Sequence, residues 1–183
     1  MKVEWLRPQR VLLAASAIAI GVLACRDTTT PKQSSAKEIA FEPSMTMGVG
    51  FVGVPQGRWS LGTFHSQSNL DAYNVELKSH DNTDIIISNI TVAPNGHSGW
   101  HMHPGPVLVR VITGTITFYQ GKDRTCSPQV HPAGSAFIED GGTVGIARNE
   151  SPTVEATVVA AFFIPAGTTV TRIDVPAPGN CPF

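Results

Sequence analysis

Short runs of β-branched and aromatic residues, separated by turns of glycine and proline, fill this chain from residue 83 to residue 175. Such runs favour strands, and 17 glycines with 14 prolines point to many turns and short elements. No convincing helix and no internal repeat accompany them. The pattern predicts an all-β domain, a sandwich or a barrel. The expected strands cover residues 84–92, 107–120 (two runs meeting at Thr113-Gly114), 135–139, 143–148, 156–164 and 168–175.

Length and charge narrow the class of protein further. A chain of 183 residues is near the size of one domain plus an extension, and 42% apolar residues are enough for one core. The formal net charge is −1, and only 15% of the residues are charged. Because no basic excess is present to hold a phosphate backbone, we do not expect nucleic-acid binding.

The first 24 residues have the pattern of an export signal. Lys2, Arg7 and Arg10 form a basic start that is followed by an apolar run. That run has about 14 residues, which is too few for a transmembrane helix of roughly 20 but suits a signal. The expected divisions of the chain are the signal (1–24), a flexible polar tether (25–38), lead-in strands of the barrel (39–82), and the barrel core with its C-terminal tail (83–183).

The end of the signal resembles the cleavage site of bacterial lipoproteins. In Val22-Leu23-Ala24-Cys25, small or aliphatic residues stand directly before a cysteine. The resemblance implies that Cys25 carries a lipid and is the first residue of the mature chain. The alternative is a plain secretory signal with an incidental cysteine. We therefore expect an exported protein that is either anchored in the bacterial cell envelope or periplasmic or secreted.

Two further cysteines are expected to form a disulfide bond. Cys126 lies in a polar loop and Cys181 lies in the last four residues. A pair of cysteines in an exported protein is more often bonded than free. Closing a loop of about 55 residues stabilises the fold by about 4 kcal/mol in the chain-entropy model. The alternatives are two separate thiols, or a Cys181 that pairs between chains.

The most distinctive local motif is the histidine pair in His101-Met102-His103. It follows a β-rich run and directly precedes the turn Pro104-Gly105-Pro106. Side chains at i and i+2 of a strand point to the same face, so the two imidazoles project together. Neutral imidazoles that project together are the usual start of a metal site.

The spacing of residues around this pair resembles the two motifs of the cupin family. The first motif, Gly-x(5)-His-x-His-x(3,4)-Glu-x(6)-Gly, is matched, with four residues instead of five after the first glycine, at Gly96, His101, His103 and Gly114. The second, Gly-x(5)-Pro-x-Gly-x(2)-His-x(3)-Asn, is matched at Gly134, Gly142 and Asn149. About half of the chain is covered. The resemblance, which is to the small single-domain (type-2-like) cupins, implies one jelly-roll β-barrel.

The chain departs from the family at positions that bind metal. By the resemblance, Val107 stands at the glutamate position and Gly145 at the position of the second-motif histidine, while Asp140 replaces the proline. Two of the four implied ligands are therefore missing. Two imidazoles alone make a poor site, because a divalent ion takes about four protein ligands, or three and water.

Other side chains are candidates to complete the site. His97 lies four residues before His101, Glu139 and Asp140 end the second-motif strand, and His131 precedes the Gly134 turn. Two histidines and a carboxylate would resemble the open facial triad of non-haem iron sites. The alternative is a metal-free pocket that the two histidines line. Besides the histidines, the residues expected at the pocket are Val107, Val109, Gly145 and Asn149, of which Asn149 is expected mainly to fix a turn.

These observations leave two hypotheses about function. In the first, the protein is a lipid-anchored module of the cell envelope with a degenerate metal site, and it binds a small molecule or a partner protein. In the second, it is a metal-dependent cupin enzyme of the dioxygenase or isomerase type. That enzyme would use His101, His103 and an unorthodox third ligand, His97 or Glu139, to hold iron, manganese, zinc, nickel or copper. A weaker third idea is a barrel that only forms a homodimer.

Overall fold

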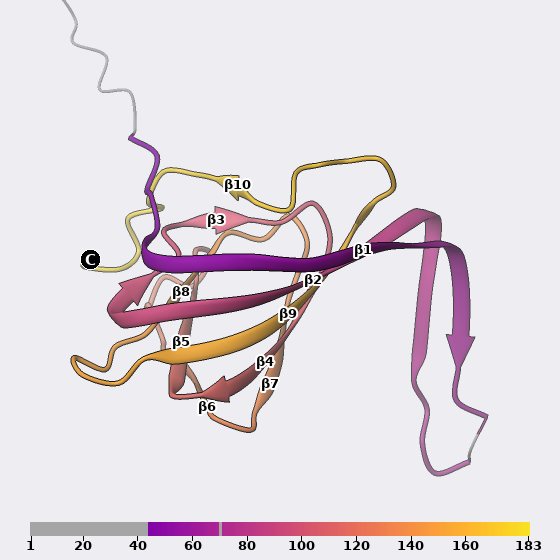
Figure 1. Cartoon of the computed structure of the whole chain (residues 1–183), viewed down its shortest axis with the longest axis horizontal. Coiled ribbons are helices and arrows are strands. Elements are labelled where there is room, and N and C mark those ends of the chain that lie inside the picture. The colour runs from indigo at the N-terminus through magenta and orange to yellow at the C-terminus, as the bar shows by residue number, and fades with distance from the viewer. Residues whose placement is uncertain (1–43, 70) are drawn as a thin grey trace, which may run out of the picture. The chain divides into compact units, whose positions relative to one another are not determined.

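The computed structural model describes residues 44–69 and 71–183. Within these ranges the chain is all-β, as predicted, and contains no helix that is long and apolar enough to cross a membrane. The predicted signal, the tether and Cys25 lie outside the described residues. The strands, shown in Figure 1, are β1 (Val49–Gln67), β2 (Glu76–His97), β3 (His101–Met102), β4 (Val107–Thr113), β5 (Thr115–Gln120), β6 (Gln129–Pro132), β7 (Ala136–Glu139), β8 (Gly145–Arg148), β9 (Ala156–Pro165) and β10 (Ile173–Asp174).

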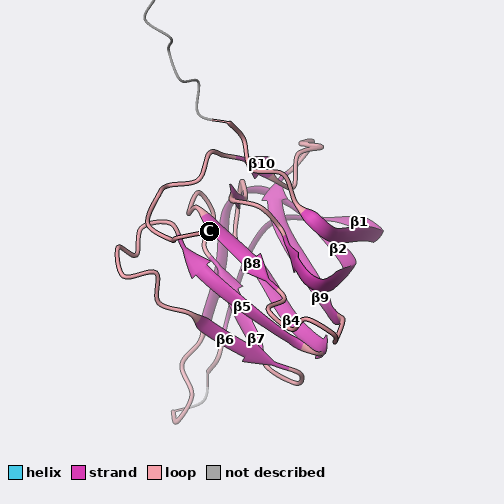
Figure 2. Ribbon diagram, turned by 90° about the vertical axis from the view of Figure 1, so that its left-hand side faces the viewer, coloured by secondary structure: helices cyan, strands magenta, loops and turns pink. Residues whose placement is uncertain are grey.

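The strands form two antiparallel layers. One layer has the order β1-β2-β9-β4-β7 and the other β10-β3-β8-β5-β6, and a single pair, His97 with Arg148, joins β2 to β8. Most neighbours within a layer are distant in sequence, as in a jelly roll and unlike a meander. The strand order therefore confirms the predicted jelly-roll barrel (Figure 2).

The core lies between the two layers. Along β9 the buried side chains alternate with partly exposed ones, and β4 shows the same alternation at its start. Because alternate side chains of a strand point to opposite faces, one face of each strand supplies the core. The core cluster draws on both layers and includes Ile90, Val107, Val111, Ile116 and Phe162.

Some strand bounds differ from the predicted ones. The run 107–120 is divided at Gly114, as predicted, and Gly114 has a left-handed φ of 70° that favours glycine. The stretch 168–175 was predicted as a strand, but only Ile173–Asp174 pairs, as β10. Most of that stretch crosses the barrel opening, where Thr171 and Arg172 reach a cavity. Strand β6 was not predicted, because Val130 is its only aliphatic residue.

Strands β1 and β2 are longer than the barrel that they help to close. Beyond Ser60 and Asp84 they continue as a two-stranded arm, residues 61–67 and 76–83, whose last pair is Gln67 with Glu76. In Figure 1 this arm extends to the right of the barrel. The lead-in region thus supplies both an edge strand of the barrel and a projecting hairpin.

The predicted disulfide bond is confirmed. Cys126 and Cys181 are bonded, with their Cα atoms 5.2 Å apart. The Nδ2 atom of Asn180 donates to the carbonyl oxygens of Gln120 and Asp123 at 3.0 Å and 2.7 Å. The C-terminal tail is therefore attached to the end of β5 and to the loop after it by a covalent bond and by two hydrogen bonds.

The cysteine loop should make the fold sensitive to acid. Hydrogen bonds from the hydroxyl and the amide of Thr125 and from the amide of Ser127 lower the pKa of Asp123 to about 2. A lowered pKa stabilises the fold above the ordinary value near 3.8, and this contribution disappears as the pH falls towards 2. We expect Asp123→Asn to lower the melting temperature at pH 7 but to match the wild type at pH 2. The prediction is contradicted if the melting temperature of the wild type exceeds that of Asp123→Asn by the same amount at pH 7 and at pH 2.

Candidate metal centre

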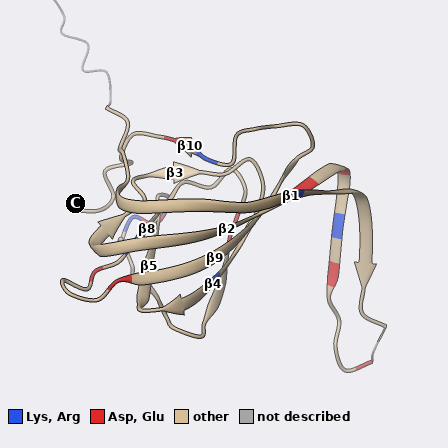
Figure 3. Cartoon of the chain, viewed as in Figure 1, with Lys and Arg blue, Asp and Glu red and all other residues tan. Residues whose placement is uncertain are grey.

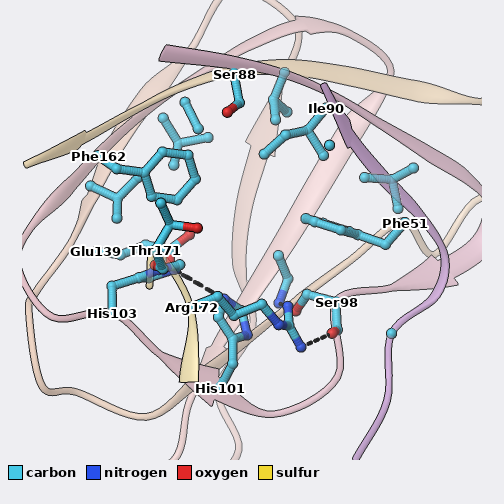
Figure 4. Close-up of a pocket in the computed structure, with 18 of the residues that line it drawn as sticks. Phe51, Ser88, Ile90, Ser98, His101, His103, Glu139, Phe162, Thr171 and Arg172 are labelled. Atoms are coloured by element: carbon cyan, nitrogen blue, oxygen red, sulfur yellow. Dashed lines mark hydrogen bonds and ion pairs between the residues drawn. The ribbon is translucent and has the colours of Figure 1, made fainter. Parts of the chain in front are cut away.

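Three ligand-type side chains meet inside the barrel opening. The Nε2 atoms of His101 and His103 lie 3.1 Å apart, and Oε2 of Glu139 lies 3.2 Å from the His103 Nε2 and 4.0 Å from the His101 Nε2. The two histidines come from β3 and the residue after it, and Glu139 ends β7 (Figure 4). The ligand atoms of all three residues lie within 4.8 Å of one another, and this is the one such cluster of three or more among the described residues.

The local sequence positions the two histidines. Gly99, just before β3, has a left-handed φ of 73°, and a Cβ atom there would lie 2.4 Å from the carbonyl oxygen of Thr46. Trp100 is buried in a second cluster with Tyr119 and Ile146. The alternation of the strand therefore directs His101 away from Trp100 and into the barrel, as the sequence indicated.

Backbone carbonyl groups fix the orientation of both imidazole rings. Nδ1 of His101 lies 2.9 Å from the carbonyl oxygen of Gly99, and Nδ1 of His103 lies 2.5 Å from that of Thr171. A carbonyl oxygen only accepts, so both Nδ1 atoms carry the hydrogen. In a neutral ring the Nε2 atom is then an unprotonated acceptor. Metal-binding histidines typically donate from their other ring nitrogen to a carbonyl or carboxylate group in this way.

The three side chains are shielded from water. The exposed fractions of the His101, His103 and Glu139 side chains are 5%, 7% and 11%. Burial, and then the positive charge of Arg172, lower the pKa of His101 to about 4. His101 is therefore neutral at pH 7 and available as a ligand.

Three atoms that can accept a proton or bind a metal ion face one another. In the neutral state the two Nε2 atoms and the Glu139 carboxylate offer lone pairs to the same small space and no hydrogen to share. Buried acceptors without a donor are costly, and a carboxylate without a counter-charge is more so. Two imidazole nitrogens and one carboxylate oxygen suit a transition-metal ion, so these three residues could hold one.

The carboxylate comes from the strand beside the expected one. Val107 occupies the glutamate position of the resembled motif, and Glu139 is its register partner across β4 and β7. Paired residues of antiparallel strands have Cβ atoms roughly 5 Å apart, on the same face of the sheet. A glutamate at either position of the pair therefore points into the same part of the barrel.

An aromatic ring leaves no room for a side chain at position 145, where the second motif has its histidine. Gly145 pairs with His101, but a Cβ atom on Gly145 would lie 2.3 Å from the ring of Phe118. Phe118 is itself buried in the core cluster. A histidine at this position would need Phe118 to move, and the cluster in the described part of the chain has three protein ligands rather than four.

The remaining sequence candidates lie away from the three-residue cluster. Nδ1 of His97 accepts a hydrogen bond from the Gly99 amide at 3.1 Å, so this ring is used to shape the turn before β3. His131 on β6 stacks on Phe137, with ring centroids 4.0 Å apart. Asp140 is exposed in the turn after β7. None of the three joins the ligand atoms.

A cavity of about 400 Å³ adjoins the cluster. Val107 and Val109 line it, whereas Gly145 and Asn149 do not. The buried amide of Asn149 instead donates to the carbonyl oxygens of Val92, Ala93 and Val154. Apolar side chains cover most of the wall. Most of the polar ones gather on the side of the histidines, whereas Ser88 lies on the opposite side (Figure 4).

Sequence reasoning missed the C-terminal residues of this site. Thr171 supplies the carbonyl group to His103, and Arg172 lines the cavity while donating to Asp174 and to the carbonyl oxygen of Ser98. No local pattern marks these residues, because they reach the site only after the chain has closed the barrel.

Comparisons with known proteins give similarity to solved structures alone. No protein-family model and no curated protein matches the chain. An oxalate oxidase structure is 22% identical with a TM-score of 0.38, and the match covers 44% of this chain and 42% of that one, which is less than half of its length. A cupin-like protein from Thermotoga maritima is 12% identical over 52% of this chain and 77% of that one, with a TM-score of 0.43. The polyketide cyclase RemF from Streptomyces resistomycificus is 14% identical over 50% and 60%, with a TM-score of 0.41.

Proposed function

We propose that this cupin-fold barrel holds one transition-metal ion on His101, His103 and Glu139 and acts as a metal-dependent enzyme of the dioxygenase type on a small organic molecule. One observation carries the proposal. Three buried acceptor atoms converge within 4.8 Å, and two backbone carbonyl groups set the tautomers of the histidines so that both Nε2 atoms are free to bind.

The ligand set favours one class of chemistry. Two histidines and one carboxylate on one side of an ion leave other coordination positions open, as in non-haem iron oxygenases. A bound ion would supply Lewis acidity and, if it is iron, activation of dioxygen. Manganese, zinc, nickel and copper are the other candidates. Isomerisation is the alternative reaction type, since it needs only the Lewis acid.

The chain's own residues shape the space for a substrate. A cavity of about 400 Å³ accommodates a small molecule. The side chains of Ile90, Val109 and Phe162 give it a mainly apolar wall, which excludes water from the ligand atoms. Arg172 places a positive charge on the polar side, and Asp174 balances that charge. A substrate with an apolar body and one polar end fits this division.

The other hypothesis, a binding module with a degenerate metal site, has less support. It rested on the absence of two ligands, and Glu139 supplies a carboxylate from the neighbouring strand. Export to the cell envelope through a lipid on Cys25 stays a proposal. The Cys126–Cys181 bond supports an oxidising compartment, because structural disulfides persist mainly outside the cytosol.

Metal analysis tests the proposal. The full chain, purified without a metal-binding tag, should contain close to one transition-metal ion per protein. The His101→Ala/His103→Ala double variant should contain only background metal. A wild-type protein that takes up none of the five metals would overturn the proposal, and a proton shared by the two imidazoles would then be the cation at this site.

A second measurement separates an enzyme from a structural metal site. Azide added to the cobalt-loaded protein should change its visible spectrum, because an open coordination position accepts an external ligand. A spectrum that azide leaves unchanged would mean that no position is open for a substrate.

A further inference from the structure

One polar side chain of the cavity beside the metal ligands stands apart from the others. Ser88, on β2, lines this cavity on the side opposite His101 and His103, and its hydroxyl group faces the interior (Figure 4). The residue is only 6% exposed, and no described residue forms a hydrogen bond with the hydroxyl. Burying a hydroxyl group without a partner costs free energy. Ser88 is therefore a candidate for contact with a bound molecule.

The strand places this hydroxyl on the inner face of the barrel and leaves it uncovered. The neighbours of Ser88 on the same face of β2 are Ile86 and Ile90, so the serine interrupts a row of aliphatic side chains. In register, Ser88 pairs with Pro55 of β1 and with Ala160 of β9. Neither of these small side chains has a polar atom for the hydroxyl, and both line the same cavity.

Two polar residues at the histidine end of the cavity already have partners. The hydroxyl group of Ser98 donates to the carbonyl oxygen of Gly99 at 2.8 Å. The guanidinium group of Arg172 is paired with the carboxylate of Asp174. Ser88 differs from them because its donor is unused within the described part of the chain.

The Ser88 end of the cavity also has no charge among the described residues. The barrel parts of β1, β2 and β9 carry no Lys, Arg, Asp or Glu apart from the Arg58–Asp84 ion pair, where the arm begins (Figure 3). The charged residues that line the cavity gather around Glu139 and Arg172 at the histidine end. A charged group beside Ser88 would lose its water without meeting a counter-charge. The group that fits there is therefore neutral.

The strand register indicates how far Ser88 lies from the metal ligands. One row of paired residues crosses β7, β4, β9 and β2 and consists of Glu139, Val107, Phe162 and Ile86. Three strand spacings make about 14 Å along the curved sheet, and the straight path across the cavity is shorter. Ser88 lies in the next inward row of β2. This separation suits a molecule about as long as a substituted benzene ring.

We propose that Ser88 is a specificity-determining residue, whose hydroxyl group donates a hydrogen bond to a neutral oxygen at the far end of the substrate. The inference rests on the proposed function and adds a second, neutral polar group to its substrate. The substrate class is then an apolar, ring-sized molecule with metal-binding oxygen at one end and a hydroxyl or carbonyl group at the other. Water is a poorer occupant, because buried waters make about three hydrogen bonds and one hydroxyl is a single partner.

Two matched probes test this inference on the cobalt-loaded full chain by calorimetric titration. Para-hydroxybenzohydroxamate and para-methylbenzohydroxamate share a metal-binding group and nearly the same shape, but only the first has a neutral oxygen at its far end. The wild type should bind the hydroxy compound about fivefold more tightly, since the methyl compound leaves the serine unpaired. Ser88→Ala should remove this preference. Ser66→Ala replaces an exposed serine on the arm, outside the cavity, and should keep the preference.

Thermal unfolding of the metal-free chain separates this role from a structural one. A hydroxyl group without a partner in the protein does not stabilise the fold, so Ser88→Ala should melt at the wild-type temperature or above it. A variant that melts several degrees lower would overturn the inference, because the hydroxyl would then bond within the protein.

The titrations distinguish a failure of this inference from a failure of the proposed function. If the chain holds cobalt but the preference is missing from the wild type or unchanged in Ser88→Ala, the role of Ser88 is wrong and the metal site stands. A chain that holds no cobalt, as metal analysis of the same samples would show, loses the proposed function and this inference with it.

Discussion

Replacing Glu139 by valine should remove the metal from this protein. Glu139 is the only carboxylate in the three-residue cluster and the only negative ligand, so without it two neutral imidazoles remain. Two nitrogen ligands are too few for a divalent ion. We expect the affinity for iron(II) or zinc to fall by about 100-fold or more, since even the loss of a group that hydrogen-bonds to a ligand lowers metal affinity by about 10–100-fold. Titration against a chelator of known affinity measures the loss.

A matched variant shows whether the loss is local. Glu155 is an exposed glutamate in the loop before β9, outside the cluster. Glu155→Val removes the same charge from the protein, so it should bind metal as the wild type does. Unchanged metal content in Glu139→Val would mean that the two histidines use a different third ligand, and the assignment of Glu139 would then be wrong.

Much of the fold follows from local patterns in the sequence. The β-branched runs predicted strands β4, β5 and β9, and the turns at Gly114 and Pro104–Pro106 predicted where strands break. The pairing of Cys126 with Cys181 was predicted because two cysteines are left once Cys25 is assigned to the expected export signal. These features depend on neighbours in sequence or on simple counting, so no knowledge of the strand register is needed.

The completed site depends on register, which the sequence does not display. A comparison of motif positions shows Val107 where a ligand was expected and therefore indicates a lost site. The pairing of Val107 with Glu139 restores the carboxylate, but it exists only once β4 and β7 are aligned. Thr171 and Arg172 are harder still to find, because their segment was predicted as an ordinary strand and mostly is not one.

The cross-strand pairing leads to a second prediction with a large effect. In Glu139→Val/Val107→Glu the carboxylate moves across one register pair, from β7 to β4, and stays on the inner face. We expect this double variant to recover most of the affinity that Glu139→Val loses, which is a gain of at least tenfold over that single variant. In this double variant the glutamate stands at position 107, where the resembled motif has it.

Moving the glutamate from position 139 to position 107 should also change how zinc affects the thermal stability of the protein. Val107 is 1% exposed, so a carboxylate there is buried without a partner in the metal-free protein and should destabilise it. A metal ion at 100 times its dissociation constant stabilises the folded state by about 2.7 kcal/mol. Zinc should therefore raise the melting temperature of the double variant and of the wild type, and leave that of Glu139→Val unchanged. If zinc has no effect on the double variant, the inner faces of the two positions are not equivalent, and the cross-strand account of the missing ligand fails.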